Sequence, residues 1–300
     1  MLALVTADVA APLDPDLDPF ERACGERFGV DAVRVVSWDD PSVDWSTFDA
    51  TVIRSTWDYH DRLDEFVGWL ARIEDATRLI NGADAIRWNL DKRYLGDLAD
   101  EGIPVVPTAF VDAGEPAPPV EGLSVVKPSV GAGSNGARRC QPGEVADHVA
   151  HLHASGLTAM VQPYLDLLDE HGESAYCFVA GPDGSLELSH VFGKAAILTS
   201  VDVEQEADLF AKEEIEARPP SADERALAER VLSTSAVGSL DDVLFARVDI
   251  APFRDVDGTE RHVLMELELI EPSFYLHTAP GSAERFAGRL AEHLGAGSRS

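Results

Sequence analysis

Two apolar segments near the end of the chain each carry charged residues two positions apart. Arg247 and Asp249 stand in one segment, and Glu266 and Glu268 stand in the other. Because side chains at positions i and i+2 of a strand point to the same face, each pair must share a face. Carboxylates repeated on one face repel each other unless a cation lies between them, and hard oxygen ligands suit Mg²⁺. The pattern indicates a magnesium site at Asp249, Glu266 and Glu268; the alternative is the solvated face of an edge strand.

A glycine-rich segment follows a strand-like run that contains Lys127. Gly131, Gly133 and Gly136 match the dinucleotide pattern G-x-G-x-x-G, but that pattern must open a helix. Here the chain continues as Ala-Arg-Arg-Cys, which is typical of a returning strand. Two strands around a glycine loop can instead cover a polyphosphate, whose oxygens accept hydrogen bonds from backbone N–H groups. A flexible surface turn is the alternative, and it leaves the apolar run around Lys127 unexplained.

Lysine is rare in this chain, so each lysine is examined for a role that arginine could not fill. Lys92, Lys127, Lys194 and Lys212 stand against twenty arginines. The compact ammonium of lysine acts as a point charge on phosphate oxygens, a role that the planar guanidinium cannot always fill. The lysines are therefore candidates for phosphate contacts, although codon bias explains their small number equally well.

Two further segments combine polar and aromatic residues next to predicted strands. The segment from Arg54 to Tyr59 ends the third predicted strand, and open α/β sheets bind ligands at the carboxyl ends of strands. A guanidinium there suits a carboxylate, whereas the alternative has Trp57 and Tyr59 in the core and Arg54 in a salt bridge. Residues 161–165 follow a strand and could offer backbone groups to a purine, although a plain linker would look the same.

The elements that must position these residues follow from the hydrophobic pattern. Apolar, β-branched runs between helix-like segments are typical of an α/β module over the first ninety residues. Strands are expected at 2–6, 33–37 and 51–54, and helices at 20–28 and 63–73. Asn89 is a suitable N-cap for a helix that runs to Ala99, before Gly102 and Pro104.

From about residue 105 the pattern changes to short strands between turns rich in Gly and Pro, which favours an α+β arrangement. Strands are expected at 105–111, 123–127, 137–140, 158–162, 175–179, 186–191, 244–250 and 262–270. Helices are expected at 144–154, 222–231 and 283–294, the last followed by a frayed Gly/Ser tail. The acidic segment Asp202–Pro220 is expected to form a mobile flap or loop.

The composition limits the partners. The 300 residues include 24 Lys and Arg against 54 Asp and Glu, a formal net charge of −30. Such a surface repels phosphate backbones and anionic lipid, so neither nucleic acid nor a membrane is an expected partner. No apolar run reaches the roughly 18 residues of a spanning helix, and the N-terminus lacks the basic region of a signal peptide. Three cysteines without ligand-like spacing favour a cytoplasmic protein.

Taken in order, these motifs resemble the ATP-grasp superfamily over essentially the whole chain. The likeness is strongest in residues 89–95, 125–136, 161–165, 246–249 and 265–272. It implies an α/β N-terminal module over residues 1–88, a small lobe with the glycine-rich loop over 89–164 and a large lobe with the metal site over 165–300. The two lobes of this α+β fold would grip ATP. The implied reaction phosphorylates a carboxylate, lets a nitrogen attack the acyl phosphate and releases ADP, as in glutathione synthetase and D-alanine–D-alanine ligase.

The resemblance also assigns roles to residues. The nucleotide-binding residues that it implies are Lys92, Lys127, Ser129, Gly131, Gly133, Ser134, Gly136, Gln162, Tyr164, Leu165 and Glu173. Arg247 matches the arginine that stabilises the acyl phosphate, and Lys194 would supply a charge that the glutathione-synthetase pattern places at Ala175. The implied Mg²⁺ ligands are Asp249, Glu266 and Glu268, and because the last is usually Asn, nearby Glu271 stays an alternative. Arg54, Trp57, Asp58 and Tyr59 are the expected substrate-side residues.

The segments 53–59 and 266–272 together resemble the small subgroup that contains the cyclo-ligase of the D-cycloserine pathway. That enzyme closes O-ureido-D-serine into a ring through the substrate's own amino-oxy nitrogen. An intermolecular dipeptide or γ-glutamyl ligase is the alternative on the same scaffold, and a nucleotide-binding module without chemistry is the alternative from another class. Either ligase would take a small amino-acid-like substrate, and superfamily relatives are often homodimers.

Overall fold

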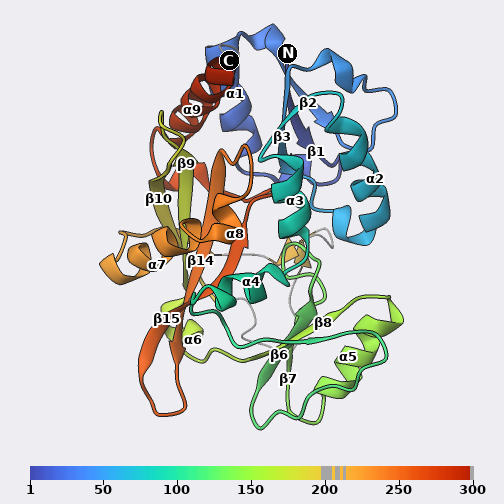
Figure 1. The fold of residues 1–300 in the computed structure, drawn as a ribbon, viewed down its shortest axis with the longest axis vertical. Helices are drawn as coiled ribbons and strands as arrows, with labels where there is room; N and C mark the ends of the chain where they lie inside the picture. The colour runs from blue at the N-terminus through green and yellow to red at the C-terminus, as the bar shows by residue number, and fades with distance from the viewer. Residues whose placement is uncertain (197–204, 207–209, 212–213, 298–300) are drawn as a thin grey trace.

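The computed structural model describes residues 1–196, 205–206, 210–211 and 214–297. The molecule is elongated, with β1 and α9 at the same end (Figure 1). Its helices are α1 (Leu17–Phe28), α2 (Leu63–Ile73), α3 (Ala83–Leu90), α4 (Tyr94–Asp100), α5 (Val145–Ala154), α6 (Leu168–His171), α7 (Ala222–Leu232), α8 (Ser235–Gly238) and α9 (Ser282–Gly297). Within the described residues, no helix combines the length and the apolarity needed to cross a membrane.

The strands form three main sheets. The first contains β1 (Leu2–Thr6), β2 (Val33–Ser37), β3 (Ala50–Ser55) and β4 (Arg78–Ile80). The second contains β5 (Ala109–Val111), β6 (Ser124–Pro128), β7 (Arg138–Cys140) and β8 (Ala159–Pro163). The third contains β9 (Glu173–Ala180), β10 (Leu186–Lys194), β13 (Ile215–Ala217), β14 (Phe245–Arg254) and β15 (Glu260–Glu268). A separate pair consists of β11 (Gln205–Glu206) and β12 (Phe210–Ala211).

The first sheet is parallel, in the order β2-β1-β3-β4. All of β1 is buried, as expected for a parallel strand covered on both faces. Alternate residues point to opposite faces, so Leu4 packs on the α1 side while Val5 joins the aromatic cluster around Phe66 and Trp69 of α2. Two helix layers therefore explain why the strands are continuous apolar runs in the sequence.

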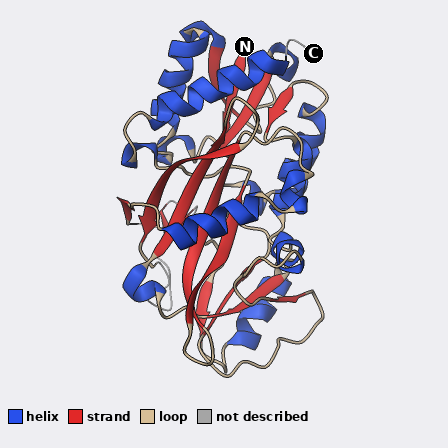
Figure 2. Cartoon of the chain, turned by 60° about the vertical axis from the view of Figure 1, so that its left-hand side comes forward, coloured by secondary structure: helices blue, strands red, loops and turns tan. Residues whose placement is uncertain are grey.

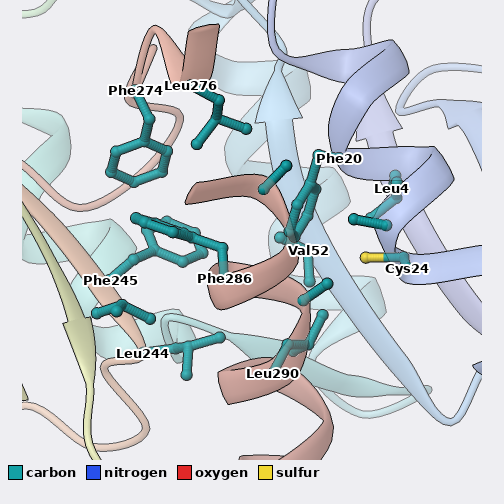
Figure 3. Packing of buried hydrophobic residues seen from close by; sticks show 14 of the residues in the cluster. Leu4, Phe20, Cys24, Val52, Leu244, Phe245, Phe274, Leu276, Phe286 and Leu290 are labelled. Carbon is teal, nitrogen blue, oxygen red and sulfur yellow. The ribbon is translucent and has the colours of Figure 1, made fainter. Parts of the chain in front are cut away.

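The C-terminal helix joins the first sheet to the third. α9 lies beside α1 (Figure 1) and contributes Phe286 and Leu290 to a core that also contains Leu4, Phe245 and Phe274. Figure 3 shows Phe286 and Leu290 between the strands of the first sheet and the phenylalanines of the large lobe. The N-terminal module and the large sheet thus share one hydrophobic core.

The third sheet is antiparallel, in the order β13-β10-β9-β14-β15, and its long strands run along the molecule (Figure 2). Its register sets the site: Arg247 lies opposite Glu268, and Asp249 lies opposite Glu266. The second sheet, in the order β5-β8-β6-β7, is also antiparallel and is covered by α5. Its β6–β7 hairpin encloses the glycine-rich segment and carries Lys127.

The sequence-based elements are largely confirmed, and the exceptions have physical causes. Asn89 is not an N-cap: it lies near the end of α3, and its side chain bonds Leu267 O and Leu269 N, so two helices replace the expected one. The strand expected at 105–111 is reduced to β5, because prolines at 104 and 107 interrupt the run. The three-residue β4 was not predicted.

Two expectations fall partly outside the described residues. Of the segment Asp202–Pro220, residues 202–204, 207–209, 212 and 213 lie outside, and of its described part Ile215–Ala217 pairs with β10 rather than standing free. The frayed tail was expected after Leu294, but α9 continues to Gly297, and residues 298–300 lie outside the description.

Asn81 ties the N-terminal module to the large sheet. Its side chain is 1% exposed, accepts hydrogen bonds from the N–H groups of Leu244 (2.8 Å) and Phe245 (3.2 Å), and donates to Phe245 O and Leu269 O (both 2.7 Å). Buried backbone groups that lose a partner cost about 1–3 kcal/mol each. These four contacts make the orientation of the first sheet depend on one side chain.

We expect Asn81→Ala to lower the free energy of unfolding by about 3 kcal/mol or more, because several buried backbone groups lose their partner. Urea titration followed by circular dichroism measures this. Gln141→Ala, which removes an exposed amide, is the control and should change little. Equal stability of the two variants would contradict the assigned role of Asn81.

Candidate active site

A cavity of about 430 Å³ lies between the three sheets. Most of the predicted site residues line it, namely Trp57, Tyr59, Lys92, Lys127, Gly131, Gly133, Ser134, Gln162, Tyr164, Leu165, Glu173, Lys194, Arg247, Glu266 and Glu268. Five predicted residues do not line it, namely Arg54, Asp58, Ser129, Gly136 and Asp249. The sequence motifs, which are spread over 212 positions from Trp57 to Glu268, therefore converge on one cavity.

The glycine-rich loop is folded over this cavity in a conformation that only some residues adopt. Gly136 has φ +71°, and a Cβ there would approach Pro128 to 3.2 Å. The Gly131 carbonyl accepts a hydrogen bond from Lys92 Nζ at 2.7 Å, and the Gly136 carbonyl lies 2.9 Å from Nε2 of His148 on α5. The loop thus contacts the small lobe at both of its ends.

Two predicted loop residues shape the loop instead of lining the cavity. Ser129 is buried, with its N–H donating to Thr158 O and its carbonyl accepting from the Lys92 N–H at 2.9 Å. These bonds fix the backbone of Lys92 beside the strand that carries Lys127. Gly136 provides the close turn over Pro128 described above.

The loop also contacts the N-terminal module. Val130 and Ala132 pack against the aromatic cluster that contains Trp57 and Phe66, and Asn135 Nδ2 lies 3.3 Å from His60 Nε2. The glycine-rich loop is therefore in contact with the module that carries Trp57. A change in the position of this loop would also change access to that side of the cavity.

Cations and carboxylates alternate along the wall made by the third sheet. Lys194 Nζ lies 2.7 Å from Asp249 and also pairs with Glu173. Arg247 donates to Asp249 at 2.9 Å and pairs with Glu268. Burial alone would raise the pKa of Asp249, but Arg247 and Lys194 hold it at about 2. Asp249 is therefore an anion that is 1% exposed and stabilised by two cations.

The other carboxylates of this wall differ in charge state. Burial acts to raise the pKa of Glu266, but Lys92, 3.1 Å away, and Lys127 outweigh it and lower the pKa. Burial raises the pKa of Glu268 to about 8 despite the neighbouring Arg247. The wall therefore holds more carboxylates than its own cations can keep ionised.

Two cavity-lining charges have no oppositely charged partner among the described residues, Lys127 and Glu271. The Lys127 ammonium forms neither a hydrogen bond nor an ion pair with any described residue, and burial lowers its pKa. Glu271 likewise has no ion pair among them; burial raises its pKa to about 7, although an interaction with the Tyr59 hydroxyl acts to lower it. An unpaired, partly buried charge is stabilised by a ligand of opposite charge.

One part of the cavity is mostly apolar and is formed by residues from several segments around β8. Leu165, Val106, Val125 and Met265 line it together with Gln162. The Gln162 amide donates to Thr108 Oγ1 at 2.8 Å, which fixes its side chain against the cavity. An apolar slot of this kind suits a purine ring, and the adenine contact expected of residues 161–165 stays a prediction.

The predicted substrate-side residues separate into two pairs. Trp57 and Tyr59 line the cavity. Arg54 is 2% exposed, lies 3.8 Å from Asp16 and faces the rings of Phe20 and Phe274. The salt bridge that the sequence left open as an alternative is therefore present, because a buried guanidinium needs an anion.

Asp58 likewise bonds protein groups instead of lining the cavity. Its carboxylate accepts from Trp38 Nε1 at 2.9 Å and lies 3.3 Å from Arg62. Asp16 accepts from the N–H groups of Phe274, Tyr275 and Leu276 at 2.6–2.8 Å. Any effect of Arg54 on substrate would act through this loop, so its substrate role stays a prediction.

Sequence reasoning missed several cavity residues. Ser273 and Tyr275 lie in the loop held by Asp16, and Asn89 and Met265 lie on α3 and β15. Asn89 and Met265 lie in segments 89–95 and 265–272, which carry the resemblance, but no role in a site was expected of them; no motif marks Ser273 and Tyr275. Glu271 was noted only as an alternative metal ligand, because it lies close to Glu266 and Glu268 in the sequence.

No group of three His, Cys, Asp or Glu side chains among the described residues is arranged as a ready metal cage. Asp249, Glu266 and Glu268 each contact a protein cation instead. Their chemistry nevertheless fits Mg²⁺: they are hard oxygen donors, and the raised pKa of Glu268 indicates a shortage of positive charge. The three residues would hold the ion if Lys92 and Lys194 moved to phosphate oxygens.

Comparison with solved structures identifies the fold. D-alanyl-alanine synthetase A from Vibrio cholerae matches with a TM-score of 0.64 at 13% identity, covering 98% of this chain and 97% of that one. The ATP-grasp ligase PsnB matches with a TM-score of 0.58 at 16% identity, covering 98% of both chains. The three-sheet fold is that of the ATP-grasp ligases, as predicted.

Closer relatives define the family. Residues 2–81 match the family described as "D-cycloserine synthetase DcsG, N-terminal domain". The cycloserine biosynthesis protein DcsG of Streptomyces lavendulae is 37% identical over 309 residues, which cover 98% of this chain and 99% of that protein. The crystal structure of D-cycloserine synthetase DcsG matches with a TM-score of 0.84, covering 98% of this chain and 99% of that one.

The chain belongs to the DcsG family of ATP-grasp ligases. It is an ATP-dependent, ADP-forming ligase that makes a carbon–nitrogen bond. The predicted superfamily, subgroup and enzyme class are confirmed, and the alternative of a module without chemistry is set aside. The residue roles stay predictions, which the following variant tests.

We expect Lys127→Ala to weaken ATP binding by about tenfold to a hundredfold, because a charge-assisted contact to phosphate is worth about 1.5–3 kcal/mol. Isothermal titration calorimetry with a non-hydrolysable ATP analogue measures this. The fold should stay intact, since Lys127 has no ion pair among the described residues. Lys127→Arg, which keeps the charge, should retain part of the affinity. An unfolded Lys127→Ala would instead show a structural role.

Proposed function

We propose that this ligase is magnesium-dependent, forms an acyl phosphate and closes O-ureido-D-serine into D-cycloserine. The observation that carries the proposal is the cavity itself. In a chain 37% identical to a D-cycloserine synthetase, one cavity is lined by an arginine, a wall of carboxylates and Lys127, which has no ion pair with any described residue. The substrate side is formed by Trp57 and Tyr59.

The proposed nucleotide position follows from the lining. The adenine would lie in the apolar part beside Gln162, Tyr164 and Leu165, with Glu173 near the ribose. The phosphates would contact Lys127, Lys92 and the N–H groups of the glycine-rich loop. Phosphoryl transfer depends mainly on such positioning and charge neutralisation.

The proposed metal site completes the charge balance. Mg²⁺ would neutralise phosphate charge while held by Asp249, Glu266 and Glu268. Lys92 and Lys194, which pair with these carboxylates now, are the cations available for the phosphates. Each carboxylate therefore keeps a cation throughout, and none is left buried and unpaired.

The proposed chemistry has two steps. In the first step the substrate carboxylate takes the γ-phosphoryl group of ATP, and ADP leaves. In the second step the lone pair of the amino-oxy nitrogen forms the C–N bond, and the nitrogen loses its proton. The C–O bond to the phosphate breaks, and phosphate leaves with the electron pair of that bond. Water removes the carbamoyl group of the ureido substrate as carbon dioxide and ammonia, as the ring product requires. Arg247 would stabilise the negative charge on the acyl phosphate and the tetrahedral intermediate. Lys194 would add a second positive charge.

Further parts of the proposal concern the setting of the enzyme. The closed loop would exclude water and protect the acyl phosphate from hydrolysis. The acidic composition favours a small-molecule partner in the cytoplasm over nucleic acid or membrane, and a homodimer is the proposed assembly.

We expect ATP, Mg²⁺ and O-ureido-D-serine to give ADP, phosphate and D-cycloserine, and chelation of the metal to stop turnover. ³¹P NMR and mass spectrometry follow the products. AMP and pyrophosphate would contradict the acyl phosphate. Turnover only when a second amino acid is added would indicate the intermolecular dipeptide or γ-glutamyl ligase instead.

We expect His60→Ala to raise the ratio of ADP released to ring product formed, because the loop loses its polar contact with the N-terminal module and water reaches the acyl phosphate. Coupled assays of ADP and product give the ratio. His171→Ala, which removes an exposed imidazole on α6, is the control. An unchanged ratio in His60→Ala would contradict the coupling of loop and module.

A further inference from the structure

Glu271 differs from the other carboxylates that face the cavity. It follows β15 by three residues, beyond the strand that carries Glu266 and Glu268. Glu266 pairs with Lys92 and Glu268 with Arg247, whereas Glu271 forms no ion pair with any residue of the described chain. Its contact is with the Tyr59 hydroxyl of the N-terminal module. Glu271 therefore belongs to the substrate end of the cavity.

The surroundings of Glu271 suit an organic ammonium group better than a metal ion. Trp57, Tyr59 and Tyr275 line the same cavity, and aromatic faces attract ammonium groups. Tyr59 is 3% exposed and stacks on Phe66 with a centroid distance of 4.9 Å, so its ring, whose hydroxyl interacts with the Glu271 carboxylate, is fixed in place. The Tyr59 hydroxyl is neutral, so it does not balance the negative charge of the partly buried carboxylate. A bound cation would balance this charge.

We propose that Glu271, positioned by Tyr59, binds the α-ammonium group of the amino-acid substrate. The assignment rests on the proposed function. The ammonium at Glu271 and the carboxylate near Arg247 would fix both charged groups of an amino acid, so that its side-chain nitrogen reaches the activated carbon. Substrates whose α-nitrogen is acylated or absent would be rejected. Glu271 is thereby separated from the metal ligands Asp249, Glu266 and Glu268.

The test compares two substrates in two proteins. O-ureido-D-serine and its analogue with hydrogen in place of the α-amino group are assayed for ADP release with wild type and Glu271→Gln. A charged hydrogen bond is worth about 10- to 100-fold, so wild type should prefer the amino substrate by that factor in kcat/KM. Glu271→Gln should lose the preference, with the ATP KM and the Mg²⁺ activation constant unchanged.

Two further variants make the result specific. Glu284→Gln makes the same change at an exposed carboxylate on α9. It is the matched control and should behave as wild type. Tyr59→Phe removes one hydroxyl and should lose part of the preference, which also provides a test if Glu271→Gln fails to fold. Equal loss for both substrates together with a higher Mg²⁺ requirement would overturn the assignment and make Glu271 a metal ligand. Absence of any preference in wild type would also overturn it.

The proposed function can fail separately from this assignment. If wild type releases ADP with neither enantiomer of O-ureidoserine, the proposed function is overturned. The role of Glu271 is then tested by calorimetry, which measures the binding of D-serine, L-serine and 3-hydroxypropanoate to wild type and to Glu271→Gln. The last of these ligands lacks the amino group. The assignment would be supported if wild type binds serine but not 3-hydroxypropanoate, and if Glu271→Gln does not bind serine. Equal binding in both proteins, or none in wild type, would overturn it.

Discussion

The structure depends on the pairing of opposite charges in a space too small and too buried for water to solvate them. Lys194, Arg247 and Asp249 are each less than a tenth exposed, and all three are joined in one network. Such a network is stable only while every charge keeps a partner, because an uncompensated buried ion costs several kcal/mol. Lys127 and Glu271, the exceptions on the cavity wall within the described chain, mark where ligand charges of opposite sign are required.

The fold serves this pairing through register and shared packing. Antiparallel pairing of β14 with β15 sets Arg247 opposite Glu268 and Asp249 opposite Glu266, and a slip of one residue would turn these side chains into the core. Asn81 and Asn89 bond the ends of β14 and β15, while α9 packs against both the first and the third sheet. The N-terminal module and the wall of the cavity that carries Arg247 and Asp249 are therefore joined by shared packing and hydrogen bonds.

Much of this could be predicted from the sequence, since buried strands, helices and charged residues two apart obey local rules. Leu2–Thr6 and Val33–Ser37 are strands as expected, and Arg247 and Glu268 face the cavity. What the sequence did not reveal depends on contacts between distant segments. Asn89 looked like a helix cap but bonds a strand 178 residues away, and Arg54 looked ligand-facing but is held by Asp16. The lack of an ion pair at Lys127 and Glu271 within the described part of the chain has no local signature in the sequence.

The central claim is that the lysine–carboxylate pairs of the cavity exchange partners when nucleotide and metal enter. A crystal structure with Mg²⁺ and a non-hydrolysable ATP analogue tests it most directly. The account predicts phosphate oxygens at Lys127 and Lys92, a metal ion at Asp249 and Glu266, and a broken contact between Lys92 and Glu266. Nucleotide bound elsewhere, or bound with the Lys92–Glu266 pair intact and Lys127 untouched, would contradict it.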